Sequence, residues 1–353
     1  MRRPRVKLSS DEEDAVYHCM TRCVNGEHLL DEVSREVLRR MMWDVAEFCG
    51  VEVITYALMP NHFHVLLKVP VKTPVSDTEL LRRYRLLHPK PTTYQTNRLS
   101  VIEGWLAQNS PDGQAWRRQQ LALMNDMSAF MKLLKQRFTL WFNATHGRFG
   151  TLWAERFKSI LVEYDRHTLQ TIAAYIDLNA VRKSLVEDPK DYRFCGYAEA
   201  VAGSKRARHG LRSISPPGTW SSVQSGYREV LYGTGGTARQ KGAVIDADHV
   251  KATLAAGGQL PLATLLRCRW NYFSSGAALG SQAFIATQLA RLARSTSRAP
   301  SSPPSKPARR ATRAGSPRPR PPRNPSPPPQ SSPPPTDWGG WFTLHPLRQR
   351  FHG

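Results

Sequence analysis

The order of β-like and helical segments along the chain predicts an α+β fold, in which a ferredoxin-like antiparallel sheet carries helices on its faces. Three observations lead to this prediction. A strand and an amphipathic helix open the chain, a β-hairpin follows, and a helix, a returning strand and another helix come after a polar stretch. The resulting β-α-β-β-α-β-α order suits an antiparallel sheet backed by helices.

The first strand and helix are expected within residues 15–49. The run Val16-Tyr-His-Cys-Met20 is rich in residues that favour strands. After residue 31, apolar side chains recur three and four positions apart, at Val33, Val37, Leu38, Met41, Val45 and Phe48. This spacing predicts a helix with one apolar face.

A β-hairpin is predicted over residues 51–69, where two apolar runs flank a Pro-Asn turn. Side chains alternate between the faces of a strand, so His62 and His64 lie on one side and can offer two imidazole nitrogens to one ion. Phe63 then faces the core. A His-x-His pair alone is weak evidence for a metal site, because a polar strand face produces the same pattern.

A basic amphipathic helix, a returning strand and a further helix are predicted over residues 127–142, 149–163 and 166–185. The first helix sets its apolar residues three and four apart, at Phe130, Met131, Leu134, Phe138 and Trp141. In the last helix, Tyr175 and Asn179 are four positions apart and share one face, so a phenol and an amide can approach the same point. Taken alone, such a tyrosine is more often an ordinary core residue.

The composition divides the chain into three parts. Residues 1–200 are expected to form one α+β domain, interrupted at about 71–126 by a polar, irregular insertion in which residues 80–87 are a possible helix. Residues 201–295 are expected to form a small helical region, with two helices at 262–273 and 277–292 around a Gly-containing turn. This region is either a DNA-recognising helix-turn-helix or a packing appendage. Residues 296–353 are expected to be a disordered tail, because 15 of the 27 prolines lie between residues 300 and 335.

The charge of the chain favours a polyanionic partner. Lys and Arg number 50 against 28 Asp and Glu, which gives a net charge of +22 and suits nucleic acid or an anionic membrane surface. From Arg291 to Gly353, twelve basic residues accompany one acidic residue, Asp337. This tail either binds phosphates without reading bases or serves only to keep the chain soluble.

The composition also predicts a soluble cytoplasmic protein without a membrane partner. The sequence has no run of 18 apolar residues, and its first residues do not resemble a secretory signal. The five cysteines are odd in number and include no Cys-x-x-Cys pair. This favours reduced thiols over a disulfide framework or a four-thiolate zinc site.

Two motifs resemble a known family of enzymes. The stretch 56–67 (YALMPNHFHVLL) resembles the HUH signature of single-tyrosine transposases, and 175–182 (YIDLNAVR) resembles their tyrosine helix. With 152–159 (LWAERFKS) and 188–192 (DPKDY), the similarity extends over about residues 15–200 to the REP-associated tyrosine transposases of the insertion-sequence type. The chain departs from the family at two positions, since Ala180 stands where proline is common and Cys23 where glycine is usual.

The resemblance implies an HUH nuclease core and a role for each motif residue. His62 and His64 would be metal ligands for Mg²⁺ or Mn²⁺, with Asn179 as the third ligand. Tyr175 would be the nucleophile that attacks DNA and forms a 5′-phosphotyrosine, leaving a free 3′-OH. No nucleotide cofactor is needed for this chemistry, and the sequence has no Gly-x-x-x-x-Gly-Lys loop.

Single-stranded or hairpin DNA is the expected substrate, because a tyrosine on a helix must reach a phosphate that a regular duplex holds in a fixed groove. The candidates for phosphate contacts are Lys132, Lys135, Arg137, Arg148, Arg156 and Lys158. Trp141 and Trp153 are candidates for stacking on bases. A solvated basic helix face with two core tryptophans explains the same residues equally well.

The sequence is compatible with several functions. The protein is expected to be a transposase, with a domesticated nickase of chromosomal repeats and a non-catalytic DNA-binding regulator as alternatives. A zinc enzyme that uses Cys19 and Cys23 together with the histidines is a more distant alternative. The protein is expected to act as a monomer or a homodimer.

Overall fold

The central feature of the fold is a five-stranded sheet with the strand order β2-β3-β1-β4-β5. The computed structural model describes residues 7–8, 10–235 and 278–297, so the predicted helix at 262–273 and nearly all of the predicted tail lie outside the described residues. The strands are β1 (Ala15–Arg22), β2 (Glu52–Met59), β3 (His62–Val69), β4 (Lys158–Val162) and β5 (Ala278–Leu279).

The four longer strands are antiparallel, and only the two-residue β5 runs parallel to its neighbour β4. The order β4-β1-β3-β2 is that of a ferredoxin-like sheet. This confirms the predicted α+β fold class and makes the sheet mixed at one edge. The returning strand is shorter than expected, because the chain joins the sheet only at Lys158.

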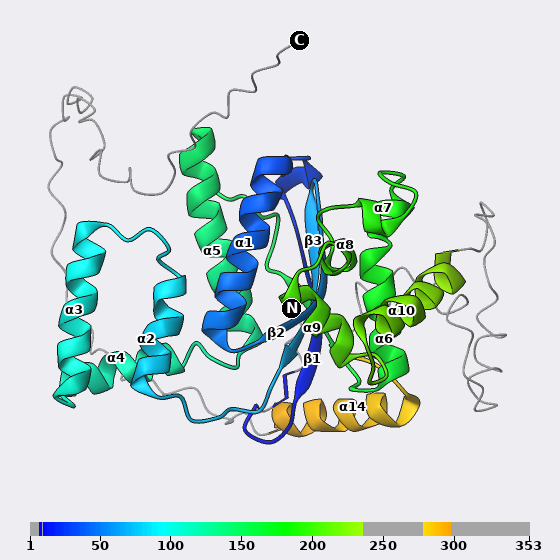
Figure 1. Cartoon of the computed structure of the whole chain (residues 1–353). Coiled ribbons are helices and arrows are strands. Elements are labelled where there is room, and N and C mark those ends of the chain that lie inside the picture. Colours follow the sequence, from blue (N-terminus) through cyan, green and yellow to red (C-terminus); the bar gives the residue numbers. More distant parts are fainter. Residues whose placement is uncertain (1–6, 9, 236–277, 298–353) are drawn as a thin grey trace, which may run out of the picture.

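Helices cover both faces of the sheet (Figure 1). One face carries α1 (Glu32–Cys49) and α5 (Met127–His146). The other carries α6 (Arg166–Asp177) and the short α7 (Asn179–Arg182), which are separated at Leu178 instead of forming the single predicted helix. Three further helices lie against β2 and α6, namely α8 (Gly196–Val201), α9 (Lys205–Ser213) and α10 (Trp220–Gly235).

Helix α1 has a capping residue at each end, Asp31 at its start and Gly50 at its end. The Asp31 carboxylate accepts a hydrogen bond from the Ser34 backbone N–H at 2.7 Å, which satisfies one of the open donors of the first turn. Gly50 ends the helix in the left-handed conformation with φ 62°, which costs glycine little. The buried side of α1 packs on α5 and on the sheet.

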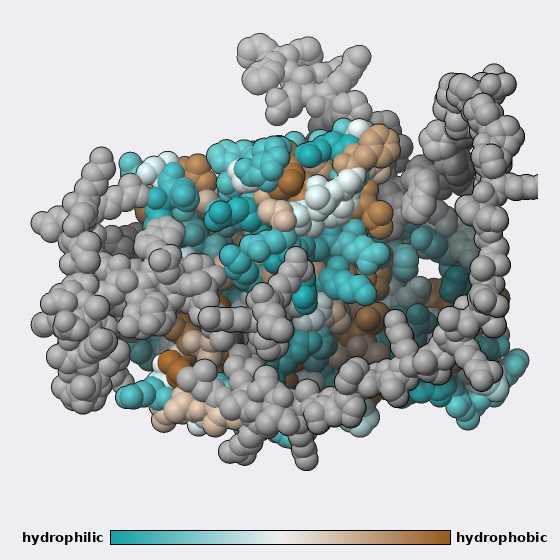
Figure 2. All heavy atoms as spheres, turned by 180° about the vertical axis from the view of Figure 1, so that it is seen from behind, coloured by the Kyte–Doolittle hydropathy of each residue, from teal (hydrophilic) through white to brown (hydrophobic). Residues whose placement is uncertain are grey.

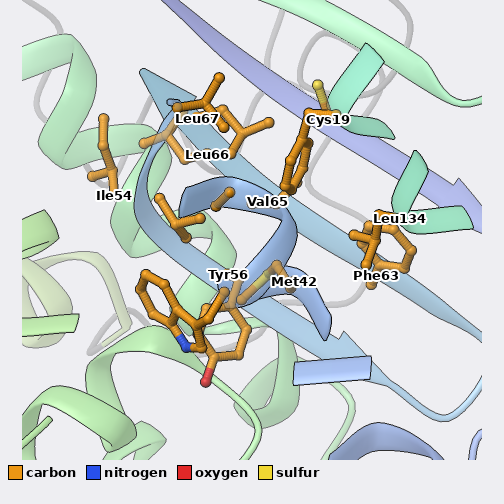
Figure 3. Packing of buried hydrophobic residues seen from close by; sticks show 14 of the residues in the cluster. Cys19, Met42, Ile54, Tyr56, Phe63, Val65, Leu66, Leu67 and Leu134 are labelled. Atoms are coloured by element: carbon orange, nitrogen blue, oxygen red, sulfur yellow. The ribbon is translucent and has the colours of Figure 1, made fainter. Parts of the chain in front are cut away.

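The face below α1 and α5 is a dry apolar core. Phe63, Val65 and Leu67 of β3 are fully buried on this side. Figure 3 shows Phe63 beside Leu134 of α5. The alternation of apolar side chains in β3 therefore places one set of residues in this core and the other set, which includes His62 and His64, on the α6 side.

The insertion between β3 and α5 is helical, although its composition predicts an irregular segment. It contains α2 (Asp77–Leu86), α3 (Thr93–Ala107) and α4 (Pro111–Leu121). Each helix starts after a Ser or Thr whose hydroxyl accepts a backbone hydrogen bond, at Ser76, Thr92 and Ser110. These capping residues explain why a polar sequence with little apolar periodicity forms helices here.

The last described segment returns to the sheet. Helix α14 (Gln282–Ser297) follows β5 and lies close to the second helix predicted at 277–292. The backbone N–H of Glu163 donates to Leu279 at 2.8 Å, which attaches this segment beside β4. Among the described residues, no helix is long and apolar enough to span a membrane. Hydrophilic residues dominate the middle of the face in Figure 2, with hydrophobic ones scattered around them.

Candidate active site

A cavity of about 730 Å³ lies on the α6 side of the sheet. Its lining includes His62 and His64 of β3, Tyr175 of α6 and Asn179 of α7. The structure thus brings these four residues together, although His62 and Asn179 are more than 110 positions apart in the sequence. The ring centroids of His62 and His64 are 5.1 Å apart, and those of His64 and Tyr175 are 6.1 Å apart.

His62 is held by the residue before it. Its Nδ1 lies 2.6 Å from the Asn61 side-chain oxygen, while the Asn61 amide nitrogen donates to the Gly26 carbonyl at 3.0 Å. Burial, followed by the positive charges of Arg22 and Lys183, lowers the pKa of His62 to about 4. The imidazole is therefore neutral at pH 7 and can coordinate a cation through Nε2.

His64 is more deeply placed and shares a hydrogen bond with His18 of β1. The distance from His18 Nε2 to His64 Nδ1 is 2.9 Å, and the two rings stack with centroids 5.1 Å apart. Burial, followed by the charges of the nearby histidines, lowers the pKa of His64 well below its usual value. His64 is thus also neutral at pH 7.

Sequence reasoning missed His18, although its position on β1 contained a signal. Within β1, His18 shares a face with Met20 and Arg22, because alternate residues of a strand point the same way. Met20 pairs with His64 and Arg22 with His62 across the two strands. Knowledge of this register would have placed His18 beside the predicted metal ligands.

Tyr175 lies against the guanidinium group of Arg182. The Arg182 Cζ is 4.7 Å from the centre of the tyrosine ring, and Nη1 donates to the Tyr175 backbone carbonyl at 2.8 Å. Burial raises the pKa of the Tyr175 phenol, whereas the charge of Arg182 lowers it. Burial also lowers the pKa of Arg182, to about 10, so this arginine still carries its charge at pH 7.

Helix α6, which carries the tyrosine, is tied to its surroundings by the buried Asp177. The carboxylate accepts hydrogen bonds from the Thr55 hydroxyl at 2.8 Å, the Tyr227 hydroxyl at 2.7 Å and the Tyr197 backbone N–H at 3.2 Å. Burial raises the pKa of Asp177 to about 6. These contacts link α6 to β2, α8 and α10 and were not predicted from the sequence.

Asn179 lies at the start of α7, with its amide nitrogen turned back toward α6. The nitrogen donates to the carbonyls of Tyr175 at 3.2 Å and Ile176 at 3.1 Å. The amide oxygen is then the atom of this side chain that suits a cation. Ala180, one of the two departures from the family pattern, is fully buried in α7.

The donor set suits a hard divalent cation held by nitrogen and amide oxygen. Two neutral imidazoles and one carboxamide line the same cavity. In the part of the chain that the structure describes, no three His, Cys, Asp or Glu side chains are grouped to hold a metal ion. Cys19 is paired with Val65 and faces the dry core, so the zinc alternative loses its support.

Two of the six predicted phosphate-binding residues, Arg156 and Lys158, line the cavity. Lys132 is exposed on α5, while Lys135 donates to the Glu155 carbonyl at 2.9 Å and Arg148 lies 5.9 Å from the ring centre of Phe142. Four further titratable side chains that the sequence did not single out line the cavity: Arg22, His28, Lys183 and the acidic Glu155.

Three of the predicted DNA contacts are partly or fully buried. Arg137 is half-buried and donates to the Leu87 carbonyl, which joins α5 to the end of α2. Trp141 and Trp153 are both buried, and Trp153 donates its indole N–H to the Thr139 hydroxyl at 2.9 Å. For the tryptophans, the alternative that they are core residues is the correct one, because their rings pack among the aromatic side chains of α5 and β3.

Part of this chain is similar in sequence to known transposases. A solved structure of a REP-associated tyrosine transposase bound to a REP hairpin is 15% identical, with a TM-score of 0.35 over 57% of this chain and 85% of that one. No curated protein matches the chain. Residues 12–79 match the family of IS200-like transposases. This match includes β1, the hairpin and both histidines, and it confirms the resemblance of this chain to the IS200-like transposases.

Proposed function

We propose that this protein is a metal-dependent DNA transposase that cleaves a single strand by attack of Tyr175 on a phosphodiester. The observation that carries the proposal is the shared cavity of His62, His64, Tyr175 and Asn179. The match of residues 12–79 to IS200-like transposases supports DNA as the substrate. The proposed catalytic unit is the predicted domain of residues 1–200.

The reaction exchanges one phosphoester for another. The Tyr175 oxygen forms a bond to phosphorus, and the bond from phosphorus to the 3′ oxygen breaks. The phenolic proton is lost to solvent, and the departing oxygen takes up a proton to become a 3′-OH. Attack of another 3′-OH on the 5′-phosphotyrosine reverses the step and completes strand transfer.

Arg182 supports the nucleophile in this scheme. A buried phenol is a poor nucleophile, because burial raises its pKa. The guanidinium above the ring favours the phenolate through its charge and holds the ring in place through cation–π contact. Arg182 therefore offsets part of the cost of placing the tyrosine in a closed cavity.

His62, His64 and Asn179 are the residues proposed to hold Mg²⁺ or Mn²⁺. Bound there, such an ion supplies Lewis-acid chemistry by withdrawing charge from the scissile phosphate. The low pKa values of the two histidines keep their nitrogens available for coordination at neutral pH. Arg22, Arg156 and Lys183 add positive charge around the cavity and suit the neighbouring phosphates of the strand.

Single-stranded or hairpin DNA is the proposed substrate. Tyr175 is only 3% exposed, so the phosphate must enter the cavity to reach it. A flexible strand can bend into such a site, whereas a regular duplex keeps its phosphates on a rigid outer surface. A nickase that cuts without strand transfer would use the same residues and would differ only in the fate of the 3′-OH.

A labelled hairpin oligonucleotide tests the proposal. Incubated with Mg²⁺ or Mn²⁺, a DNA labelled at its 3′ end should give a labelled protein band, and the same DNA labelled at its 5′ end should give a shortened free fragment. Tyr175→Phe and His62→Ala should lose both products. Tyr164→Phe is the matched control, because Tyr164 is 53% exposed and does not line the cavity. Normal cleavage by Tyr175→Phe would refute the assignment.

A further inference from the structure

We infer that His18 is a positioning residue that fixes which nitrogen of His64 faces the proposed metal site. The inference rests on the proposed function, because it concerns the same cavity. It assigns a role to a residue that neither the sequence motifs nor the chemistry above requires. The supporting observation is the hydrogen bond between His18 Nε2 and His64 Nδ1, at 2.9 Å between two buried rings.

A hydrogen bond between two imidazole rings needs one donor and one acceptor. If His64 Nδ1 donates, its Nε2 keeps a lone pair and can bind a cation. If His18 Nε2 donates instead, the proton of His64 is on Nε2, and that nitrogen cannot coordinate. Metal binding through His64 Nε2 therefore requires His18 to accept the bond and to carry its own proton on Nδ1.

His62 shows how the same problem is solved at the other ligand. Its Nδ1 lies 2.6 Å from the Asn61 side-chain oxygen, an atom that can only accept. The proton of His62 is thereby fixed on Nδ1, and Nε2 is left for the cation. Both proposed ligands thus use Nδ1 for a contact within the protein, and His18 is to His64 what Asn61 is to His62.

His18 is better suited to support than to direct ligation. His18 is fully buried and, unlike His64, does not line the cavity. Its ring stacks on His64 with an interplanar angle of 22°, and its edge contact with Tyr175 has a centroid distance of 6.1 Å. One side chain therefore contacts both a proposed ligand and the proposed nucleophile, which fixes their relative placement.

Two substitutions separate the hydrogen bond from packing. His18→Gln keeps an acceptor near the position of Nε2, whereas His18→Leu keeps bulk and removes the acceptor. We expect His18→Leu to weaken Mn²⁺ binding, measured by electron paramagnetic resonance, by about 10- to 100-fold, and His18→Gln to retain most of it. His88→Leu is the control, because His88 is a half-buried histidine outside the cavity.

The protonated nitrogens can be read directly in the full-length protein. In a sample with ¹⁵N-labelled histidine and Mg²⁺, we expect His64 and His18 each to carry its ring proton on Nδ1. This spectrum of the unmodified chain decides the inference even if His18→Leu fails to fold. A proton on Nε2 of His18 in the presence of Mg²⁺, or Mn²⁺ binding by a folded His18→Leu as tight as in the unmodified chain, would overturn it.

The proposed function fails in a different way. If the unmodified chain does not bind Mn²⁺, or His64→Ala binds it equally well, the metal site itself is wrong and the role of His18 falls with it. If His64→Ala loses Mn²⁺ while His18→Leu binds normally, the metal site stands and only the role of His18 is refuted. Direct coupling of ¹⁵N-labelled His18 to bound Mn²⁺ would make His18 a ligand and likewise refute a positioning role.

Discussion

Strand β3 separates two unlike environments within one element. Toward α1 and α5, the side chains of Phe63, Val65 and Leu67 are fully buried among apolar groups. Toward α6, His62 and His64 meet a cavity, a tyrosine and basic residues. Successive residues of the strand therefore alternate between a structural role and a proposed chemical role.

The contrast explains how a buried polar site can be tolerated. Placing neutral histidines, a phenol and an arginine out of water costs free energy unless each finds partners. The apolar face contributes burial without such a cost, and the hydrogen bonds of Asp177, Asn61 and His18 reduce the cost on the other face. Burial of apolar side chains on one face thus offsets the free-energy cost of burying polar side chains on the other.

Removing one large side chain from each face of β3 tests most directly whether the two faces have different roles. Phe63→Ala should lower the free energy of unfolding by about 3–5 kcal/mol, because it leaves a cavity in a closed core. His64→Ala should cost less stability but abolish Mn²⁺ binding. Urea denaturation and metal titration measure both effects. Equal destabilisation with no loss of metal binding would make the α6 side an ordinary core.

Removing the carboxylate that anchors α6 should have the next largest effect. Asp177→Ala leaves the buried Thr55 and Tyr227 hydroxyls without their acceptor, which should cost about 2–4 kcal/mol. Tyr227→Phe removes a single bond and should cost about 1 kcal/mol. Thermal or urea unfolding checks the pair. If both variants are as stable as the unmodified chain, the polar face does not depend on these bonds.

The pH dependence of stability tests histidines inside and outside the cavity, since the half-buried His88 lies in the insertion. Burial, followed by the charge of Arg137, lowers the pKa of His88 to about 4, as in His62. Below pH 6.5 the unfolded chain binds protons that the folded chain does not, so stability present above pH 6.5 is lost as the pH falls toward 4.

For His88 alone, this loss should be about 1–2 kcal/mol after allowance for its contact with solvent. His88→Gln should reduce the loss between pH 7 and pH 4.5, measured by urea unfolding in the presence of a chelator. The remaining change would combine the loss from the histidines of the cavity with an opposite contribution from Asp177, whose pKa is raised to about 6. An unchanged pH profile in His88→Gln would contradict the lowered pKa at this position.

Substitution of Arg182 tests how strongly its positive charge lowers the pKa of Tyr175. Arg182→Met should slow formation of the covalent product about tenfold, because the phenolate loses a nearby positive charge. The optimum pH of the reaction should also shift upward, since the pKa of Tyr175 rises without that charge. Single-turnover rates across a pH series measure this, and a rate unaffected by the substitution would leave Arg182 a purely structural role.

The smallest expected effect concerns the basic residues. Arg156→Ala, at the cavity, should weaken binding of single-stranded DNA about two- to fivefold and reduce the slope of log affinity against log salt by about 0.7. Arg137→Ala should leave that slope unchanged and lower stability instead, since its guanidinium donates to Leu87. Fluorescence anisotropy at several salt concentrations distinguishes the two. The reverse result would place the DNA over α5.

The fold class and the grouping of the motif residues could be predicted because both depend on local spacing. His62 and His64 follow strand parity, and Tyr175 and Asn179 follow helix spacing, although the break at Leu178 divides them between two helices. In the insertion, α3 and α4 could not be predicted, because they rest on capping residues such as Ser110 and not on apolar periodicity.

Residues that act across elements could not be predicted in this way. His18 and Asp177 gain their partners only from the pairing of β1 with β3 and the docking of α6 on β2. Sequence spacing does not contain that information. For the same reason Trp153 and Arg137 looked like DNA contacts, because their burial depends on how α5 meets the sheet and the insertion.

The position of α9 has a consequence for how copies of this protein can meet. A Cβ on Gly210 would collide with the carbonyl oxygens of Val53 and Ile54, so glycine lets the helix lie directly against β2. A covered edge offers no row of open backbone groups to a strand from another molecule. Extension of the sheet from chain to chain is therefore blocked at β2, which protects a long apolar strand from aggregation while the protein is folded.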